Sequence, residues 1–431
     1  MCYTIPGKVI DIKQGFAVID YFGEPRKARN DFFDLSCGDY VYAQGGFVVQ
    51  KVSMEDALSS MEAWRELFFE LKKIDNRLSR VDRPGEKVGT KVKRILNKAQ
   101  NGLPVSRDEA LVLLDITDEA EKGLLFRTAN SVRQKVLSNA CCVHGIIEFS
   151  NFCRNDCLYC GIRKSNNEIS RYRMAPDEIL ASVKEAVDLG FKALVLQSGE
   201  DYHYTTEIIE GLVTKIRKEF PVLIFLSVGE RDAGFYRRMF DAGARGVLLR
   251  FESSNRKIYS DMKPGNSFND RVDHLSFLSK LGFLIATGGL LGLPGQTRQD
   301  MIEDIFLAKS FGTEMYSFGP FIPHSNTPLK DQKIISSDEA IKFIAVARLI
   351  VPDGKILVTT ALETIDRGMR RLGLLSGANS FMLNVTPVKY RKQYEIYQGR
   401  AGIEEELKIQ IEEALALLKE LGRAPTDLGV S

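Results

Sequence analysis

The first 75 residues carry short runs in which apolar and polar positions alternate. Gly, Pro and Asn-Asp separate the runs and favour turns, so each run predicts a β-strand; the runs cover residues 9–12, 16–19, 39–42 and 47–50. After Ser53, a suitable N-cap residue, apolar side chains recur at helical spacing and predict a helix. Four or five short strands and one helix predict a small barrel-like module over residues 1–75.

Residues 76–90 interrupt this pattern, because they are mostly polar and basic and contain Pro84-Gly85. Few apolar residues occur before Val92, so the segment lacks the side chains that a packed element needs. We interpret it as a solvated linker that is flexible around residues 83–89. A docking strip for an acidic partner is the alternative interpretation of its positive charge.

From Val92 onward, apolar runs of strand length alternate with helical stretches. The predicted strands are 143–149, 193–197, 222–228, 246–250, 284–291, 315–318, 356–360 and 379–383. Eight strands that alternate with helices predict an α/β fold, a (β/α)8 TIM barrel over residues 91–431 with an N-terminal helical extension. An open, doubly wound sheet would also alternate, but eight units without a long interruption favour a closed barrel.

The chain has 431 residues, of which 44% are hydrophobic and 27% are charged, as in folded globular proteins. Its formal net charge of +2 gives no reason to expect nucleic acid or an anionic membrane as a partner. No apolar stretch approaches the ~18–20 residues of a membrane span, and the N-terminus lacks a signal-peptide pattern. We therefore expect a cytoplasmic protein, in a reducing compartment where clustered cysteines favour metal chemistry over disulfides.

Three of the seven cysteines, Cys153, Cys157 and Cys160, lie close together in the sequence. They follow the first predicted barrel strand directly, and the loops at that end of barrel strands carry active sites. Three thiolates on one loop suit three corners of a cubane iron–sulfur cluster, with the fourth iron left open. A structural zinc site would need a fourth ligand nearby, and the next histidine is His203. Zinc with a distant fourth ligand, or three free thiols, are the alternatives.

The Cys-x3-Cys-x2-Cys spacing is the signature of radical S-adenosylmethionine (SAM) enzymes, and the chain from about residue 91 onward resembles the HydE family of FeFe-hydrogenase maturases. Methylornithine synthase and biotin synthase are relatives of that family. The similarity extends over motifs throughout the predicted barrel, at residues 147–151, 171–174, 196–201, 292–297, 319–324, 359–361 and 377–379.

This resemblance implies that Cys153, Cys157 and Cys160 bind a 4Fe-4S cluster whose fourth iron is chelated by SAM. One-electron cleavage of the sulfonium then yields a 5′-deoxyadenosyl radical. The resemblance also assigns cofactor contacts to six residues on neighbouring loops: Tyr159, Ser198, Glu200, Arg250, Glu252 and Arg271. The alternatives are a structural turn at residues 198–200 and a surface or packing salt bridge between Arg250 and Glu252.

The resemblance further implies that Thr359 and Thr360, at the seventh strand, present catalytic hydroxyls to the substrate. On a bare strand, threonines are simply good β formers. The Gly-rich turn at 292–297 would support the adenine of SAM. His324 matches the family, although a lone histidine is more often a hydrogen-bonding residue than a ligand.

The sequence also departs from the HydE pattern. No cysteine follows Cys160, which excludes the second, C-terminal cluster that some HydE proteins carry. Phe225 stands at a third-strand position where HydE proteins place a polar residue toward the substrate, which puts an identical substrate in question. Cys141 and Cys142, at the start of the first barrel strand, are predicted to be buried as small apolar residues rather than ligands.

Residues 1–9 resemble the start of the HypC/HupF chaperones of NiFe-hydrogenase maturation, and residues 38–48 match their later strands. In that family the N-terminal cysteine, here Cys2, helps to carry an iron with cyanide and carbonyl ligands or pairs with the hydrogenase precursor. Gln44 stands where those chaperones have a histidine, so metal binding would depend on Cys2 alone. A module that only docks or dimerises is the alternative.

Together, the two resemblances predict a radical SAM enzyme that assembles a hydrogenase-type iron cofactor. Its expected substrate is a small organometallic or thiol-containing precursor, and its electron donor is a protein such as ferredoxin or flavodoxin. The HypC-like module would hold or deliver the precursor, or recruit a hydrogenase-maturation protein. The alternatives are an amino-acid mutase resembling methylornithine synthase and a catalytically silent maturation scaffold.

Overall fold

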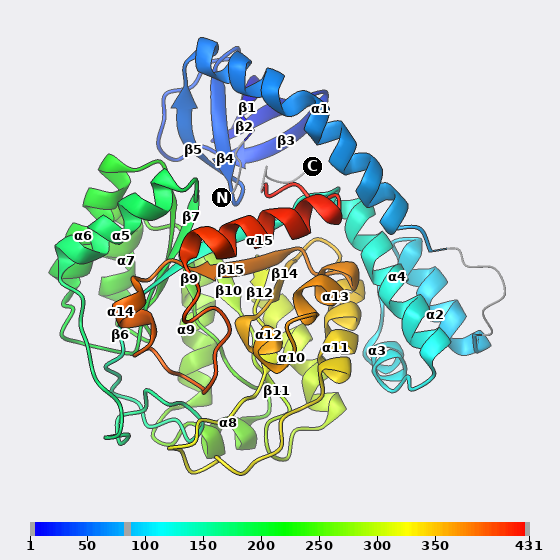
Figure 1. Cartoon of the computed structure of the whole chain (residues 1–431), viewed down its shortest axis with the longest axis vertical. Helices are drawn as coiled ribbons and strands as arrows, with labels where there is room; N and C mark the ends of the chain where they lie inside the picture. Colours follow the sequence, from blue (N-terminus) through cyan, green and yellow to red (C-terminus); the bar gives the residue numbers. More distant parts are fainter. Residues whose placement is uncertain (1–4, 82–87, 427–431) are drawn as a thin grey trace.

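The computed structural model describes residues 5–81 and 88–426, which form two closed barrels in contact with each other (Figure 1). Residues 82–87 of the predicted linker lie outside the described residues, as does Cys2. None of the helices within the described ranges combines the length and apolar character that a membrane crossing needs.

The small barrel has five strands within the described residues, joined in the order β1-β2-β3-β5-β4. They are β1 (Gly7–Lys13), β2 (Phe16–Tyr21), β3 (Glu24–Arg29), β4 (Tyr40–Gln44) and β5 (Phe47–Val52). Val9, Ile19, Val41 and Val48 are buried inside, because alternate side chains of each strand point inward. A small β-barrel is therefore confirmed.

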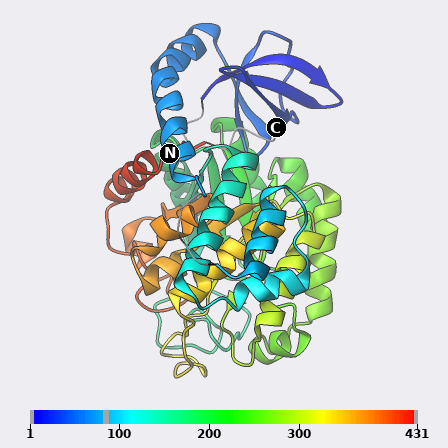
Figure 2. The ribbon, with the colours of Figure 1, turned by 90° about the vertical axis from the view of Figure 1, so that its right-hand side faces the viewer.

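Helix α1 (Met54–Leu78) leads from the small barrel to the large one, as Figure 2 shows. It begins at the predicted cap, because the hydroxyl of Ser53 accepts a hydrogen bond from the N–H of Asp56. The helix continues to Leu78, beyond residue 75, where the sequence places the end of the module. Three helices then precede the large barrel: α2 (Thr90–Gln100), α3 (Arg107–Leu114) and α4 (Glu119–Leu137).

The eight strands predicted for the large barrel all form within the described residues, and they close in the parallel order β10-β12-β14-β15-β6-β7-β8-β9. They are β6 (Cys142–Ser150), β7 (Ala193–Ser198), β8 (Leu223–Ser227), β9 (Gly246–Leu248), β10 (Leu284–Thr287), β12 (Met315–Tyr316), β14 (Lys355–Val358) and β15 (Ser380–Asn384). The predicted TIM barrel is therefore confirmed.

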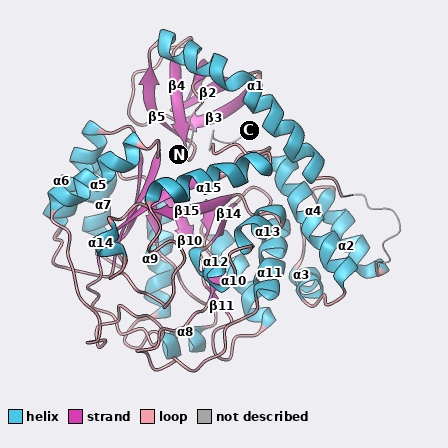
Figure 3. Ribbon diagram, viewed as in Figure 1, coloured by secondary structure: helices cyan, strands magenta, loops and turns pink. Residues whose placement is uncertain are grey.

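Helices surround these strands on the outside (Figure 3). In chain order they are α5 (Pro176–Asp188), α6 (Thr206–Glu219), α7 (Ala233–Ala242), α8 (Arg256–Met262), α9 (Phe268–Leu281), α10 (Arg298–Ser310), α11 (Ser337–Ile350), α12 (Thr360–Ile365), α13 (Met369–Leu375), α14 (Val388–Arg391) and α15 (Leu407–Glu420). Apart from α8, whose Ile258 and Met262 belong to a smaller cluster, the apolar faces of these helices share one large buried cluster with the outward side chains of the strands.

Several barrel strands are shorter than predicted, and two of these differences affect the site. The run 284–291 breaks at residues 288–289, so that β10 stays in the barrel while β11 (Leu290–Leu291) pairs with β13 (Gly319–Pro320). The seventh strand ends earlier than predicted, at Val358, where its pairing with Phe381 ends. Thr359 is consequently the N-cap of α12, and Thr360 is its first residue, so neither threonine lies on the strand.

The small barrel closes the N-terminal end of the large barrel. Phe47 and Val49 from β5 belong to the same apolar cluster as inward-facing residues of the large barrel, namely Ala193, Val195, Leu223, Phe225, Ala286, Met315 and Leu357. Gln44, at the end of β4, is buried and donates a hydrogen bond to the sulfur of Cys142 (3.3 Å). Cys141 and Cys142 are both buried, as the sequence predicts.

A buried charge cluster joins α1 to the large barrel. Asp75, in the last turn of α1, accepts two hydrogen bonds from Arg133 of α4 (2.7 and 2.8 Å). Arg423, which follows α15, lies 3.1 Å from the same carboxylate. All three side chains are at most 1% exposed, so one buried carboxylate faces two buried guanidinium groups.

Candidate active site

The cysteine loop follows the carboxyl end of β6, opposite the end that the small barrel covers. Backbone hydrogen bonds fix its shape: the N–H of Leu158 donates to the carbonyl of Met262, and that of Gly161 to the carbonyl of Ile396 (both 2.9 Å). Met262 ends α8, and Ile396 belongs to the segment between α14 and α15. Parts of the chain far apart in sequence therefore hold the loop.

Arg171 ties the two sides of the loop together. Its guanidinium donates hydrogen bonds to the backbone carbonyls of Asn151, Ile162, Arg163 and Asn166. Because these carbonyls come from both sides of the three cysteines, one cation fixes the path of the backbone around them.

The end of β7 approaches the cysteine loop closely at Gly199. A Cβ atom at this position would lie 2.2 Å from the carbonyl oxygen of Phe152 and 2.9 Å from the Cβ of Cys153, so only glycine fits. The close approach brings the N–H of Glu200 within 3.4 Å of the Cys153 sulfur.

Burial raises the pKa of all three cysteine thiols. At Cys160, the neighbouring thiolates of Cys157 and Cys153 raise the pKa further, which shows that the three sulfurs lie within electrostatic reach of one another. The thiolate is the form that binds metal, so a bound cationic centre must displace these protons.

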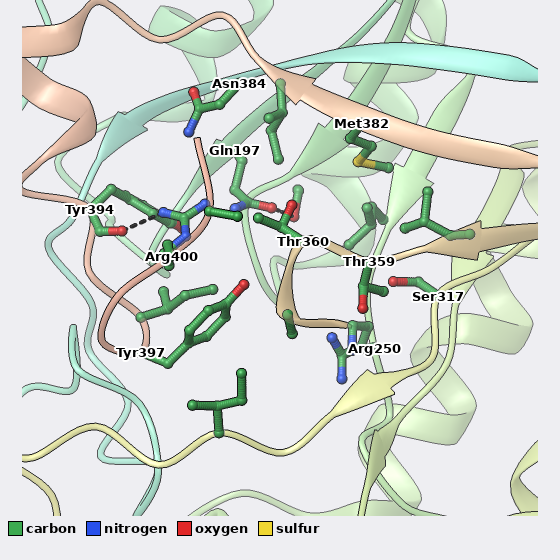
Figure 4. Close-up of a pocket in the computed structure, with 18 of the residues that line it drawn as sticks. Gln197, Arg250, Ser317, Thr359, Thr360, Met382, Asn384, Tyr394, Tyr397 and Arg400 are labelled. Atoms are coloured by element: carbon green, nitrogen blue, oxygen red, sulfur yellow. Dashed lines mark hydrogen bonds between the residues drawn. The ribbon is translucent and has the colours of Figure 1, made fainter. Parts of the chain in front are cut away.

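A cavity of about 650 Å³ opens above the three cysteines. Its wall includes each site residue named from the sequence apart from Cys2, which the structure does not describe: Cys153, Cys157, Tyr159, Cys160, Ser198, Glu200, Arg250, Glu252, Arg271, Thr359 and Thr360. Figure 4 shows part of this main cavity, with Arg250 and Thr359 facing Tyr397 and Arg400 across it.

Glu200 is fixed beside the cysteine loop. One carboxylate oxygen, Oε2, accepts hydrogen bonds from the Asn155 side chain (3.0 Å) and the Glu230 N–H (3.2 Å). The other, Oε1, has Arg154 as a neighbour at 3.8 Å. Ser198 donates its hydroxyl hydrogen bond to the Gly199 carbonyl (2.6 Å). A fixed carboxylate next to the cysteines suits the ammonium group of an amino acid.

Arg250 and Glu252 form a charge pair with unused hydrogen-bonding capacity. Arg250 Nη2 and Glu252 Oε2 form an ion pair at 2.9 Å, and the buried Nε of Arg250 has no hydrogen-bond partner in the described structure. Arg271 is buried, pairs with Glu230 and donates to the Arg250 carbonyl, so it positions the backbone of Arg250. The Arg250–Glu252 pair is therefore ready to bind a polar ligand.

Thr359 and Thr360 both lie in the cavity wall. The hydroxyl of Thr359 is buried and has no hydrogen-bond partner among the described residues. A buried, unused hydroxyl in a cavity wall is suited to a ligand that supplies the missing partner.

The Gly-rich turn after β11 does not form part of the cavity wall. Its Gln296 side chain accepts a hydrogen bond from the N–H of Gly292 (2.8 Å) and donates one to the carbonyl of Leu290 (3.0 Å), which closes the turn on itself. Of this region of the described chain, Leu290 lines the cavity, whereas residues 292–297 do not. The expected adenine surface is therefore not at the turn itself.

Two other residues lie outside the wall in the described structure. Phe225 is buried in the apolar cluster beneath the cavity, because Gly246 leaves room for its ring: a Cβ on Gly246 would lie 2.1 Å from it. His324 accepts a hydrogen bond at Nδ1 from the N–H of Asn326 (3.1 Å), so it serves as a hydrogen-bonding residue.

The main cavity has a second polar wall that the sequence did not predict. Arg400 pairs with the fully buried Glu148 (Nη2 to Oε1, 2.6 Å), and Asn384 donates to the same carboxylate (2.8 Å). Arg400, Tyr394 and Tyr397 come from the irregular segment before α15, and all three line the cavity (Figure 4). Glu148 lies within the family motif at residues 147–151, whereas Arg400 has no spacing signal in the sequence.

The three cysteines and the polar side chains beside them suit an iron–sulfur cluster together with a polar ligand. Three cysteine sulfurs border one cavity, but within residues 5–81 and 88–426 no three His, Cys, Asp or Glu side chains converge on a position for a single metal ion. That arrangement fits a multi-iron cluster and gives the zinc alternative no support. The unpartnered Nε of Arg250 and hydroxyl of Thr359 supply sites for a polar ligand beside it.

The comparisons with known proteins identify both barrels. Residues 147–308 match the radical SAM superfamily, so the large barrel is that of a radical SAM enzyme. Residues 317–423 match the biotin and thiamin synthesis associated domain, and residues 1–64 match the HupF/HypC family.

The chain belongs to the HydE family. It is 39% identical to the [FeFe] hydrogenase maturase subunit HydE of Thermotoga maritima over 312 residues, which cover 72% of this chain and 89% of that protein. It is 31% identical to the 3-methylornithine synthase of Methanosarcina acetivorans over 289 residues, 66% of this chain and 81% of that one.

Solved structures agree with this assignment. Methylornithine synthase (PylB) has a TM-score of 0.69 at 25% identity, covering 77% of this chain and 97% of its own. The maturase HydG of Carboxydothermus hydrogenoformans shares the fold, with a TM-score of 0.65 at 21% identity over 82% and 83% of the two chains. As a radical SAM enzyme, the protein uses a 4Fe-4S cluster and SAM as its cofactors.

Proposed function

We propose that this enzyme acts on a small iron- or thiol-containing precursor during assembly of a hydrogenase-type iron cofactor. When bound, the cluster supplies one electron and SAM supplies a 5′-deoxyadenosyl radical. The observation that carries the proposal is the shared cavity: three cysteines, unpartnered SAM-type contacts and a second polar wall all border one space. The fused HupF/HypC-type barrel supports hydrogenase assembly as the context.

The residues of the cysteine side are proposed to hold the cofactors. Cys153, Cys157 and Cys160 would bind the cluster, and Tyr159 would shield it, since its ring packs edge-to-face against Phe321. The carboxylate of Glu200, next to the Cys153 sulfur, would receive the SAM ammonium group.

Arg250, Glu252 and the two threonines are proposed to complete the binding of SAM and substrate. The Arg250 guanidinium suits the SAM carboxylate, and the Glu252 carboxylate suits a ribose hydroxyl or the ammonium group. Arg271 would keep Arg250 in place through the Arg250 carbonyl. The Thr359 and Thr360 hydroxyls would face the substrate.

The opposite wall is proposed to select a small polar substrate. Arg400 balances the buried Glu148, so the pair brings little net charge while its guanidinium still borders the cavity. Tyr397 and Asn384 add hydrogen-bonding groups to the same wall. A polar substrate would use the remaining hydrogen-bonding capacity of these groups, whereas an apolar one would take it out of water without replacement.

The small barrel is proposed to hold or deliver the precursor, or to recruit a hydrogenase-maturation protein. It contacts the end of the large barrel opposite the cysteine loop, and an apolar cluster that includes Phe47 and Phe225 fills the space between. Delivery through the barrel would therefore require this packing to open, whereas holding a precursor or recruiting a partner would not.

Reduction of the cluster is proposed to depend on a small acidic electron carrier such as ferredoxin or flavodoxin. Arg154 lies within the cysteine loop and its side chain is 56% exposed, so it offers a positive contact beside the cluster. Opposite charge on a partner speeds its docking more than it strengthens the complex.

The proposal is tested by anaerobic reconstitution with iron, sulfide, reductant and SAM, with and without an iron–cysteine precursor that carries cyanide and carbonyl. We expect 5′-deoxyadenosine from the intact enzyme and none from Cys157→Ala, because the cluster then loses one ligand. We expect Cys2→Ala to form deoxyadenosine normally but to impair maturation. Full SAM cleavage by Cys157→Ala would contradict the cluster assignment, and a precursor that returns unchanged would contradict the substrate class.

An amino-acid mutase is the second candidate, because 3-methylornithine synthase is 31% identical to this chain and a methylornithine synthase structure has a TM-score of 0.69. The same reconstitution with lysine in place of the iron precursor separates the two. Conversion of the amino acid, with no change of the iron precursor, would favour the mutase.

A further inference from the structure

Cys142 and His144 lie next to each other at the end of the large barrel that the small barrel covers. They are two residues apart on β6, so their side chains point to the same face of the strand. That face is the barrel interior, because Ile146 on the same face belongs to the interior cluster and Phe225 of that cluster packs against the His144 ring. Both side chains are at most 2% exposed.

The distances between the two side chains are those of ligands that share a metal ion. The Cys142 sulfur lies 3.5 Å from Nδ1 and 3.6 Å from Nε2 of His144. Metal–sulfur and metal–nitrogen bonds of about 2.3 and 2.1 Å at a tetrahedral angle place the two donor atoms about 3.6 Å apart. The pair therefore needs little movement to bind one ion.

The small barrel supplies a third polar group at the same point. Gln44 Nε2 lies 3.3 Å from the Cys142 sulfur. A half-turn of the terminal amide exchanges its nitrogen and oxygen, so the Gln44 oxygen can take this place as a neutral donor. Phe225 packs edge-to-face against the His144 ring (centroids 5.4 Å apart) and limits how that ring can turn.

The pair is also reachable from outside. A cavity of about 430 Å³ lies between the two barrels, and Cys142 forms part of its wall together with Gly45 and Gly46. Charged side chains of both signs line the same cavity, among them Arg26, Arg29, Glu24, Glu314, Asp353 and Lys355. A hydrated ion or a small charged complex can therefore approach Cys142 along the charged part of this wall.

We propose that Cys142 and His144, with Gln44 of the small barrel beside them, form a second metal site for a single divalent transition-metal ion. Thiolate and imidazole are the ligand types that bind Fe²⁺, Co²⁺ and Zn²⁺. Among the described residues these are fewer strong donors than a closed structural site has, so further ligands must complete the coordination of the ion. The Cys142 thiol releases its proton to solvent when the ion binds.

This site is separate from the cluster. Glu148, on the same face of β6, pairs with Arg400 of the main cavity wall, and it stands four residues from His144, which is about 13 Å along a strand. The inference rests on the geometry of residues in both barrels and does not depend on the substrate proposed above.

The test measures the amount of bound cobalt per chain. The full-length enzyme, loaded with its iron–sulfur cluster, is first dialysed anaerobically against micromolar Co²⁺. We expect about one tightly held cobalt per chain in the wild type, and less than about a tenth of that in Cys142→Ala and His144→Leu. Cys141→Ala is the matched control, because Cys141 is the adjacent and equally buried cysteine. Iron content and SAM cleavage verify that each variant is folded.

X-ray absorption at the cobalt edge of the wild-type enzyme gives an answer that needs no variant. We expect one sulfur and at least one imidazole in the first coordination shell. Cobalt that is absent from the wild type, bound only by oxygen donors, or retained by Cys142→Ala would overturn the proposal. None of these outcomes depends on whether the enzyme converts the iron precursor. The metal site and the proposed function are therefore tested independently.

Discussion

Glu252 carries its carboxylate into the main cavity from a backbone conformation that residues other than glycine rarely adopt (φ 66°). Such a conformation costs about 1–3 kcal/mol and persists where the surroundings impose it. Here the Glu252 N–H donates to the Gly288 carbonyl, and the Glu252 carbonyl accepts from the Leu290 N–H (3.1 and 2.9 Å). The backbone next to β11 therefore holds the carboxylate beside Arg250.

Removal of the Arg250 guanidinium should weaken SAM binding while the fold is retained. A hydrogen bond to a charged group is worth about 1.5–3 kcal/mol, so Arg250→Ala should raise the KM for SAM roughly 10- to 100-fold. Steady-state formation of 5′-deoxyadenosine measures the change. Arg256→Ala, an arginine exposed on α8, is the control and should leave the KM unchanged. An unaltered KM in Arg250→Ala would remove Arg250 from the proposed SAM site.

Among single residues, the sequence predicts those functional residues that lie close together along the chain. The three cysteines are recognisable because they lie on one loop, and the structure places them around one cavity. Arg400 is not recognisable in the same way, because its partner Glu148 lies 252 positions away and its own segment is irregular. Only the closure of the barrel, which sets β15 next to β6, brings these two parts of the chain together.

Helix α10 anchors the Gly-rich turn through a carboxyl group that is buried beneath it. Asp304 accepts a hydrogen bond from the Gln296 side chain (3.0 Å) and another from the N–H of Ser254. Burial raises the pKa of Asp304 to about 7. The folded protein therefore holds this proton more tightly than the unfolded chain, whose aspartates have a pKa near 3.9.

Ionisation of Asp304 should make the enzyme less stable as the pH rises. The contribution of its bound proton is complete below about pH 4 and is lost as the pH rises through about 7. Asp304→Asn cannot ionise, so its melting temperature relative to the wild type should increase between pH 5 and pH 8. Thermal unfolding at both pH values measures this difference. A difference that stays constant, or falls as the pH rises, would show that Asp304 is not protonated near neutral pH.

Strands that contain a run of apolar residues were predicted correctly from the sequence. The eight barrel strands carry such runs, and all eight form in the described chain. Strand β3 (Glu24–Arg29) was missed because five of its six residues are charged or proline, and Ala28 alone is buried. Its place in the barrel comes from backbone pairing with β2, which an apolar pattern does not reveal.

In the whole molecule, the contact between the two barrels is both apolar and ionic. Phe47 and Val49 pack into the end of the large barrel, and Asp75 balances Arg133 and Arg423. The predicted division into a module, a linker and a barrel did not foresee this contact, because α1 extends into the segment that looks like a linker. The burial of Asp75 depends on residues far along the chain, which no local pattern shows.

Loss of Asp75 should therefore destabilise the enzyme strongly. Asp75→Ala leaves Arg133 and Arg423 buried without their carboxylate, which costs about 3–5 kcal/mol. Urea unfolding of the cluster-loaded enzyme, followed by circular dichroism, measures the loss. Glu66→Ala, at an exposed site on the same helix, should change stability by less than about 0.5 kcal/mol. Equal effects of the two substitutions would mean that the ionic contact does not stabilise the protein.

The Asp75–Arg133–Arg423 cluster has a consequence for synthesis on the ribosome. Domains generally fold as they emerge, beginning with the first to be translated. Asp75 emerges several hundred residues before Arg423 does, so the last turn of α1 must wait, its carboxylate still hydrated, until most of the polypeptide has been made. The earliest part of the nascent chain thus reaches its final position among the last.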